Sequence, residues 1–252
     1  MATIITIKWS DFSGKGFPII QNLVSDGLQL AYRFKNSFEN SISLSTEKLV
    51  LSGAPVFTGN SAICDNSNKL ITENLTDKGS LTMLVAYRIH VVDGELRSYI
   101  FGSYPNNKGF SFFRGANTTP TQSFNLSATF YATNSSGARV QQTGLPGLPI
   151  TFNDSKSDWD IVAVRFDMET NTYSHYNRNT GEWRTVVGGS DFTFVDTASG
   201  SKIGIGSIRN STSWKGQTEV AEVLIYNKAL SDEQVLKQIG ISTEYLKSIG
   251  ID

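Results

Sequence analysis

Residues 214–234 read WKGQTEVAEVLIYNKALSDEQ, and this stretch combines two kinds of secondary structure in one run. Residues 218–226 are rich in apolar and β-branched side chains, which is typical of a β-strand. The apolar run then ends, and from Ser231 onward the composition is that of a helix start. The stretch therefore predicts a long strand followed closely by a C-terminal helix.

The start of this helix is marked by Ser231, whose hydroxyl can accept a hydrogen bond from a backbone amide of the first turn. Asp232 and Glu233 follow, where acidic side chains favour the positive end of the helix dipole. Three apolar residues then recur at helical spacing, namely Val235, Leu236 and Ile239. Gly240 is expected to end the helix, with one more short turn over 242–249. The helical segment is expected to close one end of the β-domain.

Through most of the remaining chain, apolar and polar residues alternate with the period of two of a β-strand, interrupted by turn residues. Strands are expected over 80–92, 96–103, 109–114, 123–132, 159–168, 172–176, 182–187 and 202–208. The first two are expected to pair as a hairpin around an Asp93–Gly94 turn. Residues 172–176 and 182–187 are expected to form a second hairpin with a polar tip. About a dozen strands at this spacing favour one all-β sandwich over separate domains.

Composition supports this fold class and excludes several functions. Ser, Thr and Asn make up more than a quarter of the 252 residues, as suits strands and turns. The chain has 22 Lys and Arg against 23 Asp and Glu, so it has no basic field for nucleic acid. Cys64 is the single cysteine, which rules out an intrachain disulfide and a cysteine-based metal cluster. No secretory signal or membrane-spanning run is present, so synthesis in the cytoplasm of a bacterium is expected.

The domain organisation is expected to have three parts. Residues 1–24 would form an N-terminal arm, 25–230 the β-sandwich and 231–252 a helical tail. The arm alternates like a strand from Thr3 to Lys8, and such an arm can add to the sheet edge of a neighbouring subunit. An ordinary edge strand of the same sandwich is the alternative. Trp9 is expected to anchor the arm in a neighbouring subunit.

From Asp26 onward the chain resembles LamG-like jelly-roll domains of the concanavalin A-like lectin/glucanase superfamily. The resemblance is carried by 214–234, by Trp159–Asp167, by Lys202–Gly206, and by Leu28–Phe34 with the loop at 50–55. It covers about 210 residues in the order of the family and implies an all-β fold with two antiparallel sheets of six or seven strands. The fold alone does not define a function, because it occurs in lectins, glycosidases, adhesion modules and virion proteins.

The arm, the helical tail and the missing signal peptide together resemble a structural protein of a tailed phage or prophage virion. This resemblance implies attachment to other virion proteins through residues 1–24, a homo-oligomer such as a trimer, and binding of a host surface polysaccharide. Three functions stay open: a lectin-like virion protein, a purely structural decoration or assembly protein, and a carbohydrate-active enzyme or its accessory module. Nucleic acid and membrane insertion are not expected.

The enzyme hypothesis lacks its motif. Glucanases of the resembled superfamily carry Glu-x-Asp-x-(x)-Glu on one strand, and no such run occurs here. The nearest acidic clusters are Asp167 with Glu169, and Glu219 with Glu222. The first lies at a turn, and the spacing of the second predicts carboxylates on opposite sheet faces. His90 and His175 do not suggest a Ser-His-Asp arrangement. We therefore expect no catalysis.

Calcium is the metal that turn residues could hold, because it prefers hard oxygen ligands. The candidates are Asp93, Asp154, Asp158 and Asp167. No Asp-x-Asp-x-Asp-Gly loop is present, and Asp is common in turns for local reasons. No metal site or other cofactor is therefore assigned.

Glycan binding requires an aromatic ring for the apolar face of a sugar and polar side chains for its hydroxyls. The second hairpin has this composition, with Tyr176, Asn177, Arg178, Asn179 and Trp183. A second candidate is the turn with Tyr104, Asn106 and Asn107. The alternative for Trp183 is packing or a subunit interface. Trp159 and Trp214 are expected in the core.

Overall fold

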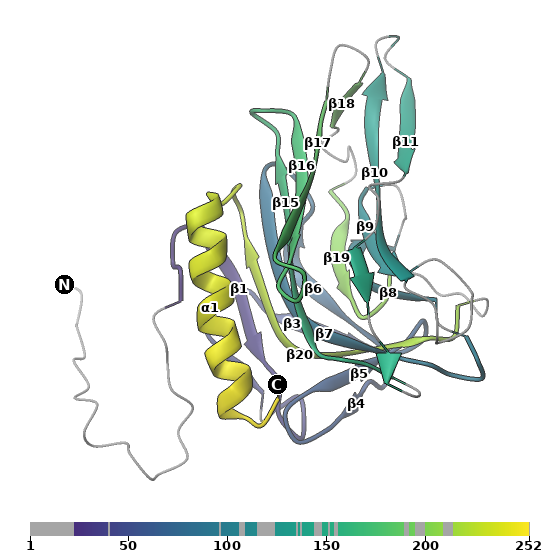
Figure 1. Cartoon of the computed structure of the whole chain (residues 1–252), viewed down its shortest axis with the longest axis vertical. Helices are drawn as coiled ribbons and strands as arrows, with labels where there is room; N and C mark the ends of the chain where they lie inside the picture. Colours follow the sequence, from purple (N-terminus) through teal and green to yellow (C-terminus); the bar gives the residue numbers. More distant parts are fainter. Residues whose placement is uncertain are drawn as a thin grey trace, which may run out of the picture.

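The structure is a computed structural model, shown in Figure 1. It describes residues 23–39, 41–95, 97–105, 109–114, 124–134, 136, 138–143, 148–150, 152–153, 156–188, 192–194, 200–208 and 214–251. Residues 1–22 lie outside this set, and with them Trp9 and most of the predicted arm. The statements below concern the described residues.

Two antiparallel sheets form a β-sandwich (Figure 1), which confirms the predicted fold class. The first sheet has the order β17 (Glu182–Val187), β16 (Thr172–Asn177), β15 (Asp160–Asp167), β7 (Leu81–His90), β20 (Gln217–Tyr226), β1 (Leu28–Arg33) and β2 (Ile42–Ser43). Its short additional strands are β4 (Val56–Phe57), β5 (Ala62–Cys64), β13 (Phe152–Asn153) and β14 (Lys156–Ser157).

The second sheet has the order β11 (Arg139–Thr143), β10 (Phe124–Asn134), β9 (Ser111–Arg114), β8 (Ser98–Tyr104), β19 (Lys202–Ile205), β6 (Lys69–Thr76) and β3 (Leu49–Ser52). The short strands β12 (Leu148–Ile150) and β18 (Phe192–Phe194) pair with β10. Within the described chain, each sheet thus has a main path of seven strands, in agreement with the upper expectation from the sequence.

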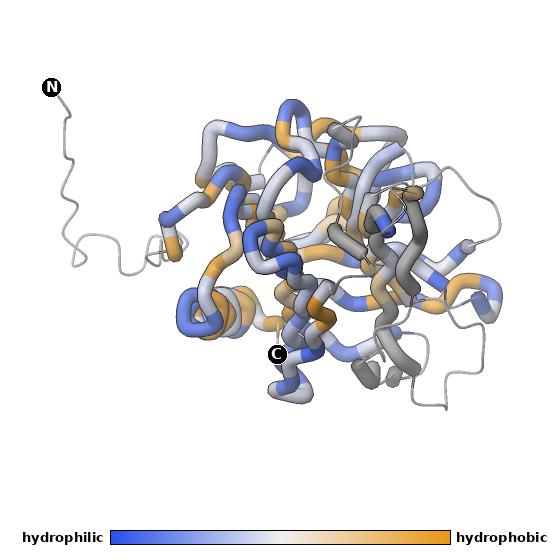
Figure 2. Tube along the Cα trace, turned by 90° about the horizontal axis from the view of Figure 1, so that it is seen from above, coloured by the Kyte–Doolittle hydropathy of each residue, from blue (hydrophilic) through white to orange (hydrophobic). Residues whose placement is uncertain are grey.

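The first sheet is apolar on both faces because both faces are covered. On β7, Met83 and Val85 belong to the core between the sheets, whereas Leu84 and Ala86 belong to a second core on the other side. We call the side turned away from the second sheet the outer face. In Figure 2 the apolar segments lie mainly inside the body, and polar turns lie around its margin. The alternation of side chains along a strand therefore determines on which face of the sheet each one lies, but not whether it is exposed.

Helix α1 (Asp232–Ser248) covers part of the outer face (Figure 1). Ser231 caps it as predicted, because its side chain accepts from the Gln234 amide while the Gln234 side chain accepts from the Ser231 amide. Two expectations were wrong. The helix runs through Gly240 without a break, and it lies along the sheet rather than closing one end of the sandwich. Burial of Tyr245 and Leu246 beyond Gly240 explains why the helix continues.

The exposed position of Gly240 leads to a stability prediction. A Cβ atom added at Gly240 would meet nothing within 4 Å, so Gly240→Ala is expected to raise the free energy of unfolding by about 0.5–1 kcal/mol. Gly250 is the matched control. Its φ of +74° lies in the left-handed region, so Gly250→Ala is expected to lower stability. Urea denaturation of both variants tests the pair, and destabilisation by Gly240→Ala would contradict the helix described here.

The predicted pairing of strands 80–92 and 96–103 was also wrong. The turn itself is confirmed, since Asp93 and Gly94 have φ values of +52° and +74° and Val92 pairs with Glu95. After this turn, however, the chain crosses to the second sheet, where β8 pairs with β9 and β19. A turn signal between two alternating runs predicts a reversal of direction but does not reveal which sheet the next strand joins.

Candidate functional site

The predicted hairpin of β16 and β17 forms an edge of the first sheet (Figure 1). Tyr176 and Trp183 lie directly opposite each other in this hairpin. Their ring centroids are 5.2 Å apart, and the ring planes are inclined by 53°. Both side chains are half-buried and pack against the margin of the outer-face core. The hairpin therefore combines packing with partly exposed aromatic surface, so the two sequence interpretations of Trp183 are compatible.

The positively charged guanidinium of Arg165 is fixed against the Trp183 ring. Its guanidinium carbon lies 4.7 Å from the centroid of the Trp183 ring. Nη1 donates to the Leu230 carbonyl at 2.8 Å and to the Asp232 carboxylate at 2.7 Å, while Nε donates to the Ser174 hydroxyl. Arg165 thus links the start of α1 to the hairpin. This contact brings together three segments that are distant in the sequence.

The tip of the hairpin is anchored to Trp159. Arg178 Nη2 donates to the Trp159 carbonyl at 2.9 Å, and Asn179 Nδ2 donates to the same oxygen at 3.2 Å. Asn179 is exposed and Arg178 is half-buried. These hydrogen bonds hold two of the predicted polar residues in place at the tip of the hairpin that contains Tyr176.

Asn177 has a different place from the one expected. It is fully buried, its side-chain amide donates to the Asp160 carboxylate, and its oxygen accepts from the Thr180 amide. Burial raises the pKa of Asp160 to about 6, although hydrogen bonds from the Ile161 amide and from the hairpin act in the opposite direction. Asn177 therefore shapes the tip from within and is not available to a ligand on the surface.

The second candidate set is separate from the hairpin. Tyr104 ends β8 in the second sheet, is half-buried, and has Lys69 Nζ 5.5 Å from its ring centroid. Asn106 and Asn107 lie outside the described residues. Because Tyr104 belongs to the other sheet, it does not contribute to the hairpin site, and glycan contact at this turn stays a prediction.

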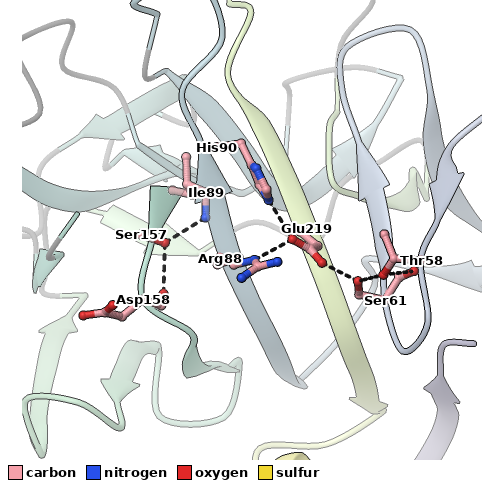
Figure 3. A network of polar contacts seen from close by, with 8 residues as sticks. All are labelled: Thr58, Ser61, Arg88, Ile89, His90, Ser157, Asp158 and Glu219. Carbon is pink, nitrogen blue, oxygen red and sulfur yellow. Dashed lines mark hydrogen bonds and ion pairs between the residues drawn. The ribbon is translucent and has the colours of Figure 1, made fainter. Parts of the chain in front are cut away.

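A polar network around Glu219 lies on the outer face and was missed at the sequence level (Figure 3). Glu219 accepts hydrogen bonds from Arg88 Nε and Ser61 Oγ, and its Oε2 lies 2.6 Å from His90 Nε2. Burial alone would raise the pKa of Glu219, but these three contacts outweigh it and lower the pKa to about 2. Glu219 is therefore ionised at neutral pH although its side chain is only 3% exposed.

The face assigned to Glu222 was wrong. Val220 pairs with Tyr87 and Glu222 pairs with Ala86, so β20 has a β-bulge at Ala221. The extra residue brings both carboxylates to the outer face, where Glu219 bonds Arg88 and Glu222 bonds Arg33. Strand alternation alone could not predict this, because nothing in the residue types around Ala221 signals a bulge.

The Glu219 network does not have the geometry of a nucleophile or a general acid. Within the described part of the chain, Ser61 donates to Glu219 and not to His90, whereas activation of a serine requires a hydrogen bond to the histidine. A glycosidase acid needs a raised pKa, and that of Glu219 is lowered. The arrangement instead orients Arg88 and His90 on the surface.

The turn aspartates do not converge. Asp93 contacts Lys215 at 3.2 Å, and Asp167 accepts from the amides of Glu169 and Thr170 within its own turn. Asp158 is exposed beside Trp159, and Asp154 lies outside the described residues. Over the described ranges, no three His, Cys, Asp or Glu side chains are grouped closely enough to hold a metal ion.

The two core tryptophan predictions had different outcomes. Trp159 is 8% exposed and belongs to the outer-face core, as predicted. Trp214 is half-buried and belongs to neither core, so that prediction was wrong. Its ring stacks on Tyr99 at 4.4 Å and contacts Phe113. Trp214 precedes β20, which explains why an apolar residue at this position can leave the sheet interior.

Solved structures show where this fold occurs elsewhere. The receptor-binding domain of botulinum neurotoxin type G is similar with a TM-score of 0.56 at 9% identity, over 86% of this chain and 52% of that chain. The binding domain of botulinum neurotoxin serotype D/C is similar with a TM-score of 0.54 at 14% identity, over 85% of this chain and 52% of that chain. The binding domain of botulinum neurotoxin DC, in a complex with SialylT, has a TM-score of 0.53 at 15% identity, over 85% of this chain and 51% of that chain.

These likenesses show a shared two-sheet β-sandwich fold, and this chain spans about half the length of the chains it matches. The similar structures are receptor-binding domains rather than enzymes. No protein-family model and no curated protein matches the chain. Among the described residues, no helix is both long and apolar enough to cross a membrane.

Proposed function

We propose that this chain is a non-enzymatic carbohydrate-binding protein and that its ligand contacts the hairpin surface. This surface is formed by Tyr176, Arg178, Asn179 and Trp183. The observation that carries the proposal is that one hairpin presents two partly exposed aromatic rings 5.2 Å apart and, at its tip, two polar side chains whose positions are fixed by hydrogen bonds. The lectin-like fold of the chain supports the same function class.

The chemistry of a sugar fits this surface. Aromatic rings pack against the apolar C–H face of a pyranose, and amide and guanidinium groups bond its hydroxyls. Arg178 and Asn179 are already held by the Trp159 carbonyl, and Arg165 already supports Trp183. Binding therefore needs little further ordering of side chains, which lowers the entropic cost of association.

A finer form of the proposal places the protein on a phage virion, where it would attach to host polysaccharide. It rests on the sequence pattern, with residues 1–24 as the attachment arm and a homo-oligomer as the assembly. Repeated copies would strengthen weak individual sites through effective concentration. Light scattering of the full chain and of a variant lacking residues 1–24 tests the assembly part. A monomeric full chain would contradict it.

Trp183→Ala is expected to remove most carbohydrate binding. Purified chain is applied to immobilised bacterial surface polysaccharides, and retention by at least one of them is expected for the unchanged protein. The variant loses the larger of the two rings, so its retention is expected to fall at least about tenfold. Unfolding is checked in parallel, because removal of a half-buried ring costs less than the roughly 3–5 kcal/mol of a fully buried one.

Thr185→Ala is the matched control, since Thr185 lies two residues further along β17 and is exposed. Its retention is expected to equal that of the unchanged chain. Equal retention of all three proteins would move the site away from the hairpin surface. Retention of none of them on any polysaccharide, at a concentration that allows avidity, would favour the purely structural alternative.

A further inference from the structure

Arg88 is held in one orientation beside Trp159, the residue whose carbonyl anchors the tip of the hairpin. It lies on the outer face of β7, where its Nε donates to Glu219 (Figure 3). Its guanidinium carbon lies 4.8 Å from the centroid of the Trp159 ring. Glu219 is itself fixed by Ser61 and His90. A guanidinium that is held by an ion pair on one side and an aromatic ring on the other loses little conformational freedom when it binds a ligand.

The terminal nitrogens of Arg88 are available. The hydrogen bond to Glu219 uses Nε, and neither Nη1 nor Nη2 has a hydrogen-bond partner among the described residues. The Arg88 side chain is 21% exposed, so these N–H groups reach solvent. Two parallel N–H donors in a planar fork match the two oxygens of a carboxylate, which neutral sugar hydroxyls do not.

Arg178 provides a second positive charge beside Trp159. It bonds the Trp159 carbonyl and the Asn179 side chain, both of which are neutral. Its charge also favours the ionised form of the buried Asp160 and so acts to lower the pKa of that carboxyl, but the two groups form no ion pair among the described residues. Trp159 thus has Arg88 on its ring and Arg178 on its carbonyl. The negative charge of Glu219 is buried and already accepts three hydrogen bonds. Asp158 is the nearby exposed acid, and Figure 3 shows its carboxylate directed away from Arg88.

We propose that Arg88, together with Arg178, binds the carboxylate of an acidic sugar in a glycan that also contacts the hairpin surface. The proposal rests on the proposed carbohydrate-binding function and defines its ligand class as carboxylated glycans. A uronic acid and a sialic acid share this chemistry. In either case the carboxylate would accept both Nη donors of Arg88, while Arg178 would add attraction from the hairpin tip.

The first test changes the ligand and leaves the protein unchanged. The full chain is titrated with an oligouronate and with a sialylated oligosaccharide, each compared with its carboxyl-reduced form. Loss of a charge-assisted bidentate contact is expected to weaken binding about 10- to 100-fold for the ligand that fits. The ligand pair that shows this difference, uronate or sialylated, identifies the type of acid. Equal binding of acid and reduced forms would overturn the carboxylate assignment and leave carbohydrate binding intact, whereas binding of neither form would overturn both.

The second test changes the fork. Arg88→Lys keeps the positive charge but not the planar pair of donors, and it is expected to lose at least tenfold in affinity for the acid while its affinity for the reduced form stays the same. Arg184→Gln is the control, because Arg184 lies opposite His175 on the face toward the second sheet. An acid preference that survives Arg88→Lys would place the carboxylate elsewhere.

Discussion

Glu219→Gln is expected to lower the free energy of unfolding by about 3–5 kcal/mol at neutral pH. The substitution keeps the shape of the side chain but removes the buried charge that Arg88 and His90 contact. Arg88, whose side chain is only 21% exposed, would then lack its counter-charge, and Ser61 and His90 would face a neutral amide in place of the carboxylate. Urea denaturation at pH 7 measures the effect. Glu73→Gln is the control, since Glu73 is exposed on β6, and a change within about 0.5 kcal/mol is expected for it.

The pH dependence of this difference has a defined sign. The native pKa of Glu219 is about 2, below the ordinary value of 4.5, so the folded state binds its proton less tightly than the unfolded state does. The contribution of Glu219 is therefore complete above about pH 4.5 and is lost as the pH falls toward 2. The stability difference between the unchanged chain and Glu219→Gln should shrink over that window. A difference that stays constant from pH 5 to pH 2.5 would contradict the account of the network.

The two proteins are compared at each pH because other groups also titrate between about pH 2 and pH 6.5. Burial and the charge of Arg184 lower the pKa of His175 to about 4. The folded state therefore binds this proton less tightly than the unfolded state does, and His175 lowers the free energy of unfolding as the pH falls below 6.5, its ordinary pKa. Asp160 has the opposite effect, because its raised native pKa reduces stability as the pH rises toward 6. Both groups are unchanged in Glu219→Gln, so their contributions cancel in the comparison.

Arg33→Met is expected to have an effect of similar size, about 3–5 kcal/mol. Arg33 Nε and Glu222 Oε1 are 2.8 Å apart, both side chains are 2% exposed, and the guanidinium carbon lies 3.9 Å from the centroid of the Tyr245 ring of α1. Loss of Arg33 leaves a buried carboxylate without this partner. The double variant Arg33→Met with Glu222→Met is expected to be more stable than either single variant, because neither member of the pair is left as an unpaired buried charge.

A double-mutant cycle by urea denaturation measures this coupling. Lys247 and Glu244 serve as the control pair, since their ion pair is 3.0 Å long but both side chains are more than half exposed. Their coupling is expected to stay below about 1 kcal/mol. A coupling for Arg33 and Glu222 no larger than that of the surface pair would show that the helix does not shield the outer face as described.

Local patterns in the sequence predicted most of the fold. The alternation of 80–92 and the strand that ends at Tyr226 became β7 and β20, which are adjacent in the first sheet. The polar tip between 176 and 182 correctly indicated a hairpin. Ser231 was correctly identified as a helix cap. These features depend on neighbours within a few residues, which is why the sequence alone could indicate them.

The errors occurred where distant contacts decide the structure. The helix continues past Gly240 because tertiary burial outweighs the roughly 1 kcal/mol preference against glycine. The bulge at Ala221 and the crossing of the chain after Gly94 depend on strand pairing, for which the chain has no local signal. Asn177 has the residue type of a sugar ligand, but its neighbour Asp160 draws it into the interior.

The same limit applies to the candidate site. Tyr176, Arg178, Asn179 and Trp183 could be grouped from the sequence because they belong to one hairpin. Arg165 and Arg88 could not, since they come from β15 and β7 and reach the hairpin region only through the order of strands in the sheet. A site assembled across strands requires the sheet order, and that order was available only from the structure.

The central claim is that carbohydrate binds the hairpin surface, and amide and indole NMR shifts during a titration with the retained oligosaccharide test it most directly. The account predicts that the largest shifts occur at the Trp183 indole, at Asn179 and at the backbone around Tyr176, and that they are absent in Trp183→Ala. Saturating shifts confined to the second sheet around Tyr104, with the hairpin signals unchanged, would contradict it.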